Sequence, residues 1–293
     1  MMASGLHISF VFVSCSLLSA GRCRVEKELS PECKAFLYMG TPPRGLEHHP
    51  VRYICQFYNK KPRYVTLYHS EFRIPIYSAY TFKRTDGERC VDVPWMYEPQ
   101  LSTLSETDEM QPFPRKYIHM NFEDSQAILD DYTNAIHYER GTLNPDEHQD
   151  ELDDKASTYT LTNVVPMVPV FTNIIWSRQE HIVRKRLNNY CRGTAYIVTG
   201  VTTSGTKIRR DNLDRIAVPK YVWSAYCCAN YDHNTPYEER HKFPSFAHYA
   251  LNENTDNNVV ELSVQKLKDF FEKTMFFSKN FQIFADDCIP PAA

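Results

Sequence analysis

The stretch that decides the fold is Thr162-Asn-Val-Val-Pro-Met-Val-Pro-Val-Phe-Thr-Asn-Ile-Ile-Trp-Ser-Arg-Gln-Glu180. Residues 158–165, which lead into it, are rich in β-branched side chains and predict a strand. From residue 176 to 190 the apolar side chains recur on one side of a basic segment, which predicts a helix. A strand followed along the chain by a long helix is therefore expected at its centre.

Further elements are predicted on both sides of this stretch. Strands are expected at 63–69, 74–82, 193–200 and 218–228, and helices at 125–132 and after Ser263, which can cap its helix. Residues 94–115 read as a long loop and the acidic residues 145–154 as a solvated loop. Because strands and helices mix without a regular βαβ rhythm, we expect one α+β domain, with a central antiparallel sheet and flanking helices.

The N-terminus has the pattern of a secretory signal peptide. An apolar run from Ile8 to Ala20 is too short to span a bilayer and ends in small residues. We expect a signal peptide at residues 1–22 and a folded domain at 30–290, in a secreted protein with no membrane segment in the mature chain. The alternative for the apolar run is a buried N-terminal strand.

The cysteines fit an oxidising compartment. There are nine, of which Cys15 lies in the expected signal peptide, and none is spaced as in a zinc site. Scattered cysteines in a secreted chain indicate disulfides, although the sequence does not decide how they pair. Cleavage before or after Cys23 would leave eight or seven cysteines.

The overall charge gives no indication that the protein binds a polyanion strongly, since the formal net charge is −3. Two short basic runs, 184–186 and 207–210, could follow a phosphate backbone. A solvated protein face is the commoner reason for such runs, and we favour it.

Two segments resemble the DNA/RNA non-specific endonucleases. Tyr138-Glu-Arg-Gly-Thr-Leu-Asn-Pro145 resembles their D-R-G-H motif, and the stretch from Thr162 to Glu180 resembles their run S/T-N-x-x-P-Q, then N, W and E. Residues 93–100, 159–163 and 221–228 resemble the secreted subgroup of endonuclease domain-containing 1 proteins. The shared order and spacing of these segments carry more weight than any one of them.

The resemblance implies a ββα-metal nuclease site. In that family a histidine deprotonates the attacking water, an asparagine on the following helix holds Mg²⁺, and arginines bind the scissile phosphate. DNA or RNA would be the partner, bound through its phosphate backbone.

Carried over residue by residue, the motif loses its general base. Glu139, Arg140 and Gly141 follow the family pattern, but the histidine position is Thr142. A threonine hydroxyl is not basic near neutral pH, and general acid–base help is worth about 10² to 10⁴ in rate. We expect Glu139 and Arg140 to keep a structural role, as a buried ion pair beside a turn at Gly141.

The metal ligand is displaced as well. Spacing from Asn163 and from Trp176 places the ligand position at Thr172, and the family's glutamine at Met167. Asn173 is a possible substitute ligand, but one residue rotates a helix by about 100° and would turn it away unless the helix start shifts.

Glu180 and Arg184 match a metal-site glutamate and a phosphate-binding arginine of the family. Their spacing places both on one helix face, where they could equally form an ordinary surface salt bridge. His137, His148 and His181 are the nearest replacements for the lost base, but their positions fit surface residues better than catalytic ones.

Three hypotheses follow. The first is a secreted pseudo-nuclease whose Mg²⁺-dependent hydrolysis is lost or very weak. The second is an active extracellular endonuclease that uses Asn173 and an unusual base. The third is an extracellular interaction or structural protein on an inherited scaffold. The oligomeric state stays open.

Overall fold

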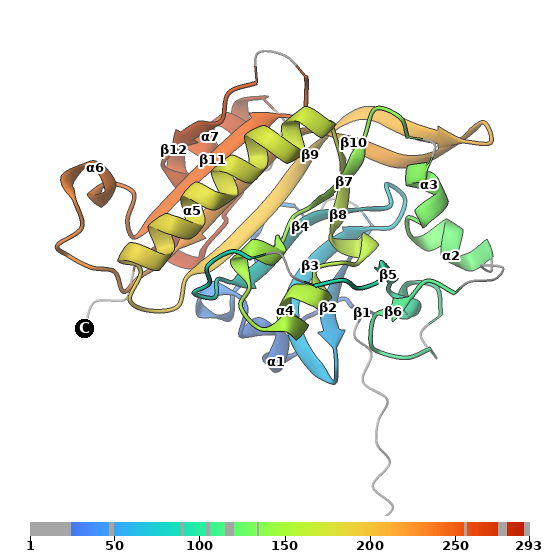
Figure 1. The fold of residues 1–293 in the computed structure, drawn as a ribbon, viewed down its shortest axis with the longest axis horizontal. Helices are drawn as coiled ribbons and strands as arrows, with labels where there is room; N and C mark the ends of the chain where they lie inside the picture. The colour runs from blue at the N-terminus through green and yellow to red at the C-terminus, as the bar shows by residue number, and fades with distance from the viewer. Residues whose placement is uncertain are drawn as a thin grey trace, which may run out of the picture.

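One antiparallel sheet runs through the whole molecule (Figure 1). The computed structural model describes residues 25–46, 50–88, 91–103, 106–114, 120–133, 135–254, 257–274 and 280–289. In spatial order its strands are β1 (Val25–Glu26), β2 (Val51–Tyr58), β3 (Lys61–His69), β4 (Ile74–Thr81), β9 (Tyr196–Arg210), β10 (Leu213–Cys227), β11 (Ser245–Leu251) and β12 (Val260–Leu262). The predicted antiparallel sheet of an α+β fold is confirmed.

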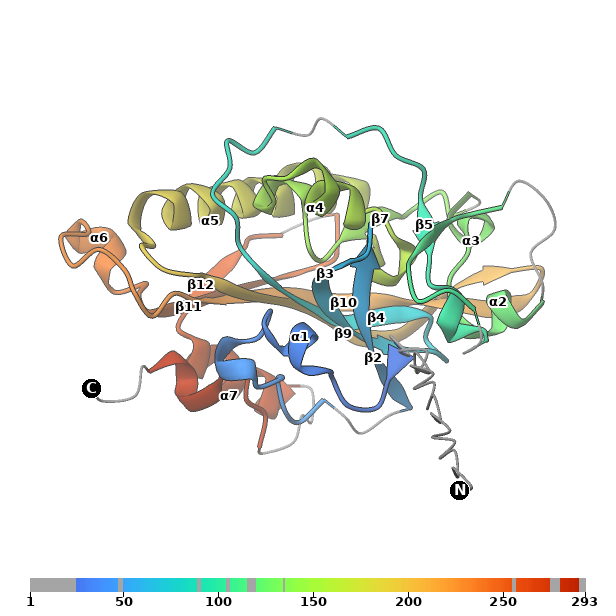
Figure 2. The same ribbon diagram turned by 90° about the horizontal axis from the view of Figure 1, so that it is seen from below.

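Helices cover both faces of the sheet (Figure 2). One face carries α5 (Ser177–Tyr190) and α4 (Leu152–Ser157), and the opposite face carries α7 (Val264–Thr274) and α1 (Pro31–Lys34). Strand β10 contributes side chains to the cores on both faces of the sheet. Trp223 and Ala225 belong to the core that contains α7, whereas Val222 and Tyr226 belong to cores on the α5 side. This alternation is the two-residue period of a strand buried on both faces.

The stretch from Thr162 to Glu180 folds with the segment before it as a ββα unit. Strand β7 (Glu139–Thr142) pairs antiparallel with β8 (Val164–Met167), so that Glu139 lies opposite Met167 and Thr142 opposite Val164. A π-helix, η5 (Phe171–Trp176), follows β8 and continues into α5. The two segments that carry the family resemblance are therefore neighbours in space.

The remaining elements are short. They are η1 (Tyr38–Gly40), β5 (Met96–Tyr97), η2 (Pro99–Leu101), β6 (Gln111–Pro112), α2 (Met120–Ser125), α3 (Leu129–Thr133), η3 (Asp146–His148), η4 (Leu161–Asn163), α6 (Tyr237–Arg240) and η6 (Ala285–Cys288).

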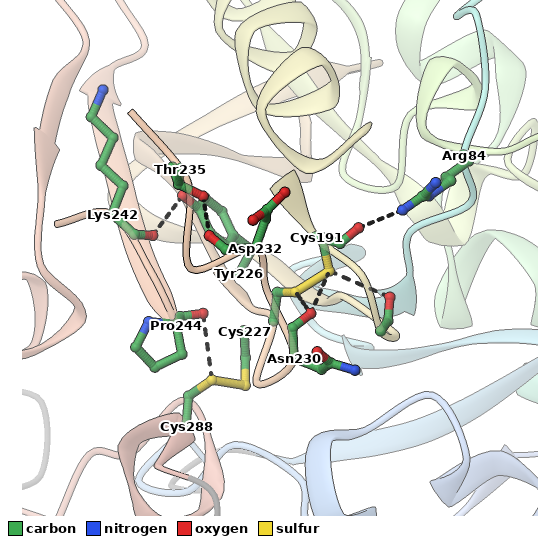
Figure 3. The surroundings of a disulfide bond; sticks show 12 residues. Arg84, Cys191, Tyr226, Cys227, Asn230, Asp232, Thr235, Lys242, Pro244 and Cys288 are labelled. Atoms are coloured by element: carbon green, nitrogen blue, oxygen red, sulfur yellow. Dashed lines mark hydrogen bonds between the residues drawn. A yellow bond between two sulfur atoms is a disulfide. The ribbon is translucent and has the colours of Figure 1, made fainter. Parts of the chain in front are cut away.

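Three disulfides join the layers. Cys33–Cys55 ties α1 to β2, Cys191–Cys228 ties the end of α5 to the end of β10, and Cys227–Cys288 ties β10 to η6. Adjacent residues of a strand point to opposite faces, so Cys227 and Cys228 bond to partners on opposite sides of the sheet. Figure 3 shows both bonds, with Arg84 donating to the Cys191 carbonyl oxygen beside one of them (2.6 Å). Cys15, Cys23 and Cys90 and the predicted signal peptide lie outside the described residues.

Several predicted elements need correction. The residues 145–154 are no solvated loop, because Asp146, Glu147 and His148 are buried in η3 and α4 follows. The predicted helix at 125–132 is two short helices, α2 and α3, and the predicted strand at 158–165 is η4 followed by β8. At residues 145–154 and 158–165, burial of the segment overrides its local pattern.

Asn163 joins the two halves of the ββα unit to the sheet. Its side-chain oxygen accepts hydrogen bonds from the Ser78 hydroxyl (2.8 Å) and the backbone N–H of Asn144 (3.0 Å). Its side-chain nitrogen donates to the carbonyl oxygens of Asn144 and Thr158, both at 3.0 Å. Asn163 has no exposed surface, and all four of its side-chain hydrogen-bonding positions are used.

Replacing Asn163 with leucine should lower the free energy of unfolding by at least about 3 kcal/mol, because the buried groups it binds would lose their partners. Urea denaturation at neutral pH measures the change. Asn234 is exposed, and Asn234→Leu is the matched control, expected within about 0.5 kcal/mol of the native protein. A loss below about 1 kcal/mol for Asn163→Leu would contradict the role assigned to this side chain.

Candidate functional site

A polar cavity of about 140 Å³ opens where β7, η5 and the start of α5 meet. We call it the motif cavity. Its lining residues are Trp95, Glu139, Arg140, Thr142, Asp146, Thr158, Tyr159, Thr172, Asn173, Trp176 and Glu180. Six of the seven site residues predicted from the sequence are among them, and Arg184 is the exception. The motif residues therefore converge in one place, although their roles remain predictions.

Apolar atoms pack against strand β7 just before Thr142. Met167, at the position of the family's glutamine, is fully buried and packs against Gly141. A Cβ atom at residue 141 would lie 2.2 Å from the Met167 sulfur, so glycine is needed for this close contact. The predicted turn at Gly141 is wrong, since the residue lies inside β7.

Thr172 and Asn173 both line the cavity, although they are adjacent in sequence. An α-helix would rotate them apart by about 100°, and the prediction that Asn173 points away rested on that geometry. Residues 171–176 form a π-helix instead, and both side chains line the cavity from it. The Asn173 amide nitrogen donates to Glu139 Oε2 at 2.7 Å. The expected displacement of Asn173 is therefore wrong.

Glu139 and Arg140 are exposed, so the predicted buried ion pair is wrong. Glu139 accepts from Asn173, and the Arg140 guanidinium lies over the Trp95 ring, 4.8 Å from its centroid. The backbone pairing of β7 with β8 and the Asn163 side chain hold the two segments together instead.

Arg184 lies outside the motif cavity. It is buried, donates to the Thr85 carbonyl oxygen (3.1 Å) and lies 2.8 Å from His181 Nδ1. Both predicted roles of the Glu180–Arg184 pair required an accessible guanidinium, as a phosphate ligand or as a surface salt bridge. The loop at residues 85–87 covers Arg184, which explains why neither geometry is found.

His148 is buried, and its predicted place on the surface is wrong. One ring nitrogen lies 3.0 Å from the Tyr80 hydroxyl and the other lies 3.0 Å from the Glu180 carbonyl oxygen. With both nitrogens engaged, the ring positions α5 against the sheet and does not line the cavity. His137 is exposed and precedes β7.

The donor set of the motif cavity does not fit Mg²⁺, which requires near-octahedral oxygen ligands. Glu139, Asp146 and Glu180 line the cavity but form no cluster that could hold a metal, and Asp146 accepts from the Tyr159 hydroxyl at 2.7 Å. Thr142 and Thr172 offer neutral hydroxyls, and Asn173, whose nitrogen donates to Glu139, offers only its side-chain oxygen. Across the described part of the chain, no group of three or more His, Cys, Asp or Glu side chains is arranged to hold a metal.

The two basic runs are largely paired with acidic side chains. Arg186 is buried and bonds Glu239 (2.6 Å) and Glu261 (2.9 Å). In the second run, Arg210 pairs with Glu123 and Asp131, while Lys207 and Arg209 pair with Asp214. Neither run is a free track for phosphates.

Sequence reasoning missed Asp146 and Thr158 as cavity residues. Asp146 stands four residues after Thr142, in the segment that was expected to be solvated. Because Asp146 directly follows the motif, the sequence could have indicated it as a candidate cavity residue. Trp95 and Tyr159 were noticed only as parts of segments that resemble the family.

The chain belongs to the DNA/RNA non-specific endonuclease family, whose family model matches residues 50–282. The resemblance inferred from the two motifs is confirmed.

Two relatives are endonuclease domain-containing 1 proteins. The chain is 32% identical to that of Homo sapiens over 232 residues, which are 78% of this chain and 45% of the relative. It is 32% identical to that of Mus musculus over 205 residues, 68% of this chain and 39% of the relative. The chain therefore spans less than half the length of either relative.

The fold is also similar to a chain in the crystal structure of the EndoG/EndoGI complex, described as showing the mechanism of EndoG inhibition. The TM-score is 0.52 with 17% identity, covering 83% of this chain and 90% of that one. At this identity the likeness concerns the fold.

His248, on β11 behind the cavity wall, makes the packing of this region sensitive to pH. It is buried, and its ring lies 5.0 Å from that of the cavity residue Trp176. Burial lowers the pKa of His248 to about 3; Glu261 opposes this shift, while Arg186 and His148 add to it. Native His248 is therefore neutral at pH values where an unfolded histidine, with a pKa near 6.5, takes up a proton.

Stability should therefore fall as the pH is lowered from about 7.5 toward 3. For this one group the loss is about 2 kcal/mol between pH 7.5 and pH 5. Urea denaturation across that range should show a smaller loss for His248→Phe, by about this amount, and an unchanged loss for His137→Gln at an exposed site. Parallel pH profiles for the native protein and His248→Phe would contradict the neutral buried histidine.

Proposed function

We propose that this protein is a secreted member of the endonuclease family that binds nucleic acid but has lost efficient metal-dependent hydrolysis. The observation that carries the proposal is the meeting of Thr142 and Thr172 in the motif cavity, at the positions of the family's general base and metal ligand. The likeness to whole relatives supports only the scaffold, because the chain spans less than half their length.

The surroundings of the two threonines support lost hydrolysis. No histidine is among the described residues that line the motif cavity, and buried His148 has both ring nitrogens engaged elsewhere. Met167 fills the space beneath Gly141 with apolar atoms. An active enzyme built on Asn173 could use the side-chain oxygen as ligand, since only the nitrogen bonds Glu139, but it would still lack a histidine base among the described lining residues.

Secretion is supported by the disulfides. Three pairs of cysteines bond among the described residues, and such bonds persist in oxidising compartments. No helix in the described ranges is long and apolar enough to cross a membrane. The apolar run at residues 8–20 remains our candidate for the signal peptide.

Hydrolysis is tested with purified protein, Mg²⁺, plasmid DNA and RNA. We expect no cleavage, or cleavage at least about 100-fold slower than that of the double variant Thr142→His, Thr172→Asn, because general acid–base catalysis alone contributes about 10² to 10⁴. A Thr206→Ser variant controls for preparation, since Thr206 is exposed on β9 and does not line the cavity. Native cleavage as fast as that of the double variant would defeat the proposal.

Binding should depend only weakly on salt. Among the described residues, Arg140 is the one basic side chain that lines the motif cavity, and both basic runs are largely paired. The logarithm of the association constant for single-stranded DNA should fall with the logarithm of salt concentration with a slope no steeper than about −2. A slope of about −5 or steeper would indicate a phosphate track elsewhere. No binding at any salt would favour the interaction-protein hypothesis.

A further inference from the structure

A second cavity, of about 410 Å³, adjoins the motif cavity. We call it the aromatic cavity. It is lined by Trp95, Tyr132, Thr133, Tyr138, Glu139 and Arg140, and Trp95, Glu139 and Arg140 line both cavities. Its volume lies in the range of small-molecule sites, about 300 to 1,000 Å³.

The walls of the aromatic cavity come from three separate segments. Trp95 precedes β5, Tyr132 lies in α3, and Tyr138 precedes β7. Tyr132 is 8% exposed, and its hydroxyl has no hydrogen-bond partner among the described residues. A buried donor without a partner in a cavity wall calls for an explanation, and a polar ligand atom would supply one.

The charges of the two cavities differ in a way that selects the ligand. Three acidic side chains and one basic side chain line the motif cavity, so a phosphate there meets more acidic groups than basic ones. The aromatic cavity has one of each, Glu139 and Arg140, and otherwise three aromatic rings and Thr133. A neutral planar ring with polar edges suits it, because rings stack on its walls and the edges meet a carboxylate and a guanidinium.

We propose that the aromatic cavity is a subsite for a nucleobase of single-stranded nucleic acid, stacked against Trp95 and Tyr138, with the backbone passing Arg140 at the shared rim. A paired base inside a duplex cannot enter such a cavity, so the ligand must present unpaired bases. The proposal deepens the proposed function and rests on its nucleic-acid binding, not on the loss of hydrolysis. It makes base stacking, rather than phosphate charge, the main source of affinity.

The fluorescence of Trp95 can report the binding of a base directly. The other two tryptophans, Trp176 and Trp223, are buried at 2% and 0% exposure, whereas Trp95 is half-buried. A base stacked on Trp95 should therefore quench its fluorescence without affecting the other two. EDTA in every titration removes metal-dependent cleavage, so the binding result is independent of whether the native protein hydrolyses nucleic acid.

The native protein is titrated with decathymidylate, with an abasic deoxyribose-phosphate chain of the same length, and with the duplex of decathymidylate and decadeoxyadenylate. We expect saturable quenching by decathymidylate and at least about 10-fold weaker binding of the other two. Equal binding of the abasic chain or of the duplex would overturn the base subsite. Absence of saturable binding by all three would also overturn it and would leave the loss of hydrolysis untouched.

Two variants place the subsite. Tyr138→Ala should weaken decathymidylate binding about 5- to 100-fold, while Tyr237→Ala, at an exposed tyrosine of α6 that lines neither cavity, should leave it unchanged. Trp95→Phe should abolish the quenching but keep binding, as measured by anisotropy of a labelled decathymidylate, because phenylalanine also stacks. Native affinity in Tyr138→Ala, with an unchanged circular dichroism spectrum, would contradict the proposal. If Tyr138→Ala does not fold, the Trp95→Phe variant decides the question. Loss of quenching with binding retained supports the subsite, whereas quenching that persists contradicts it.

Discussion

The four hydrogen bonds of the buried Asn163 side chain are the constraint on which the ββα unit depends. They connect the segment after β7, the turn that leads into β8, and strand β4 of the large sheet. An amide has two donors and two acceptor positions, and here every one is used. Because these bonds set where β7 and β8 lie, they also set where Thr142 and the following helix meet. The position of the cavity therefore depends on the Asn163 hydrogen bonds and not on the side chains that line it.

Because the side chains that hold the fold differ from those that line the cavity, the site could lose its catalytic groups and keep its shape. Thr142 and Thr172 line the cavity and belong to none of the buried core clusters. Gly141 and Trp176 help to hold the fold together: one allows the close contact with Met167 and the other packs between the cavity and the sheet. The polar functions of a nuclease can change one by one while the two helical layers and the three disulfides stay in place.

The sequence predicted most of the fold, because the strands and long helices carry clear periodicity and the family motifs fix their order. It failed where burial depends on distant residues. His148 and Asp146 stand in an acidic segment that looks solvated, and only the approach of β4 and α5 buries them. Asn173 was misplaced because α-helical rotation was assumed where the chain forms a π-helix. The pairing of Cys227 and Cys228 to opposite faces follows simply once they are placed at the end of a central strand, but the sequence alone did not place them so.

The central claim is that the site, and not the scaffold, has changed. Calorimetric titration of Mg²⁺ into the native protein and into Thr172→Asn tests it most directly, because it measures the ligand set without requiring a substrate or a base. We expect no saturable binding by the native protein at millimolar Mg²⁺, and saturable binding at one site once the asparagine is restored. Stoichiometric Mg²⁺ binding by the native protein would contradict the account.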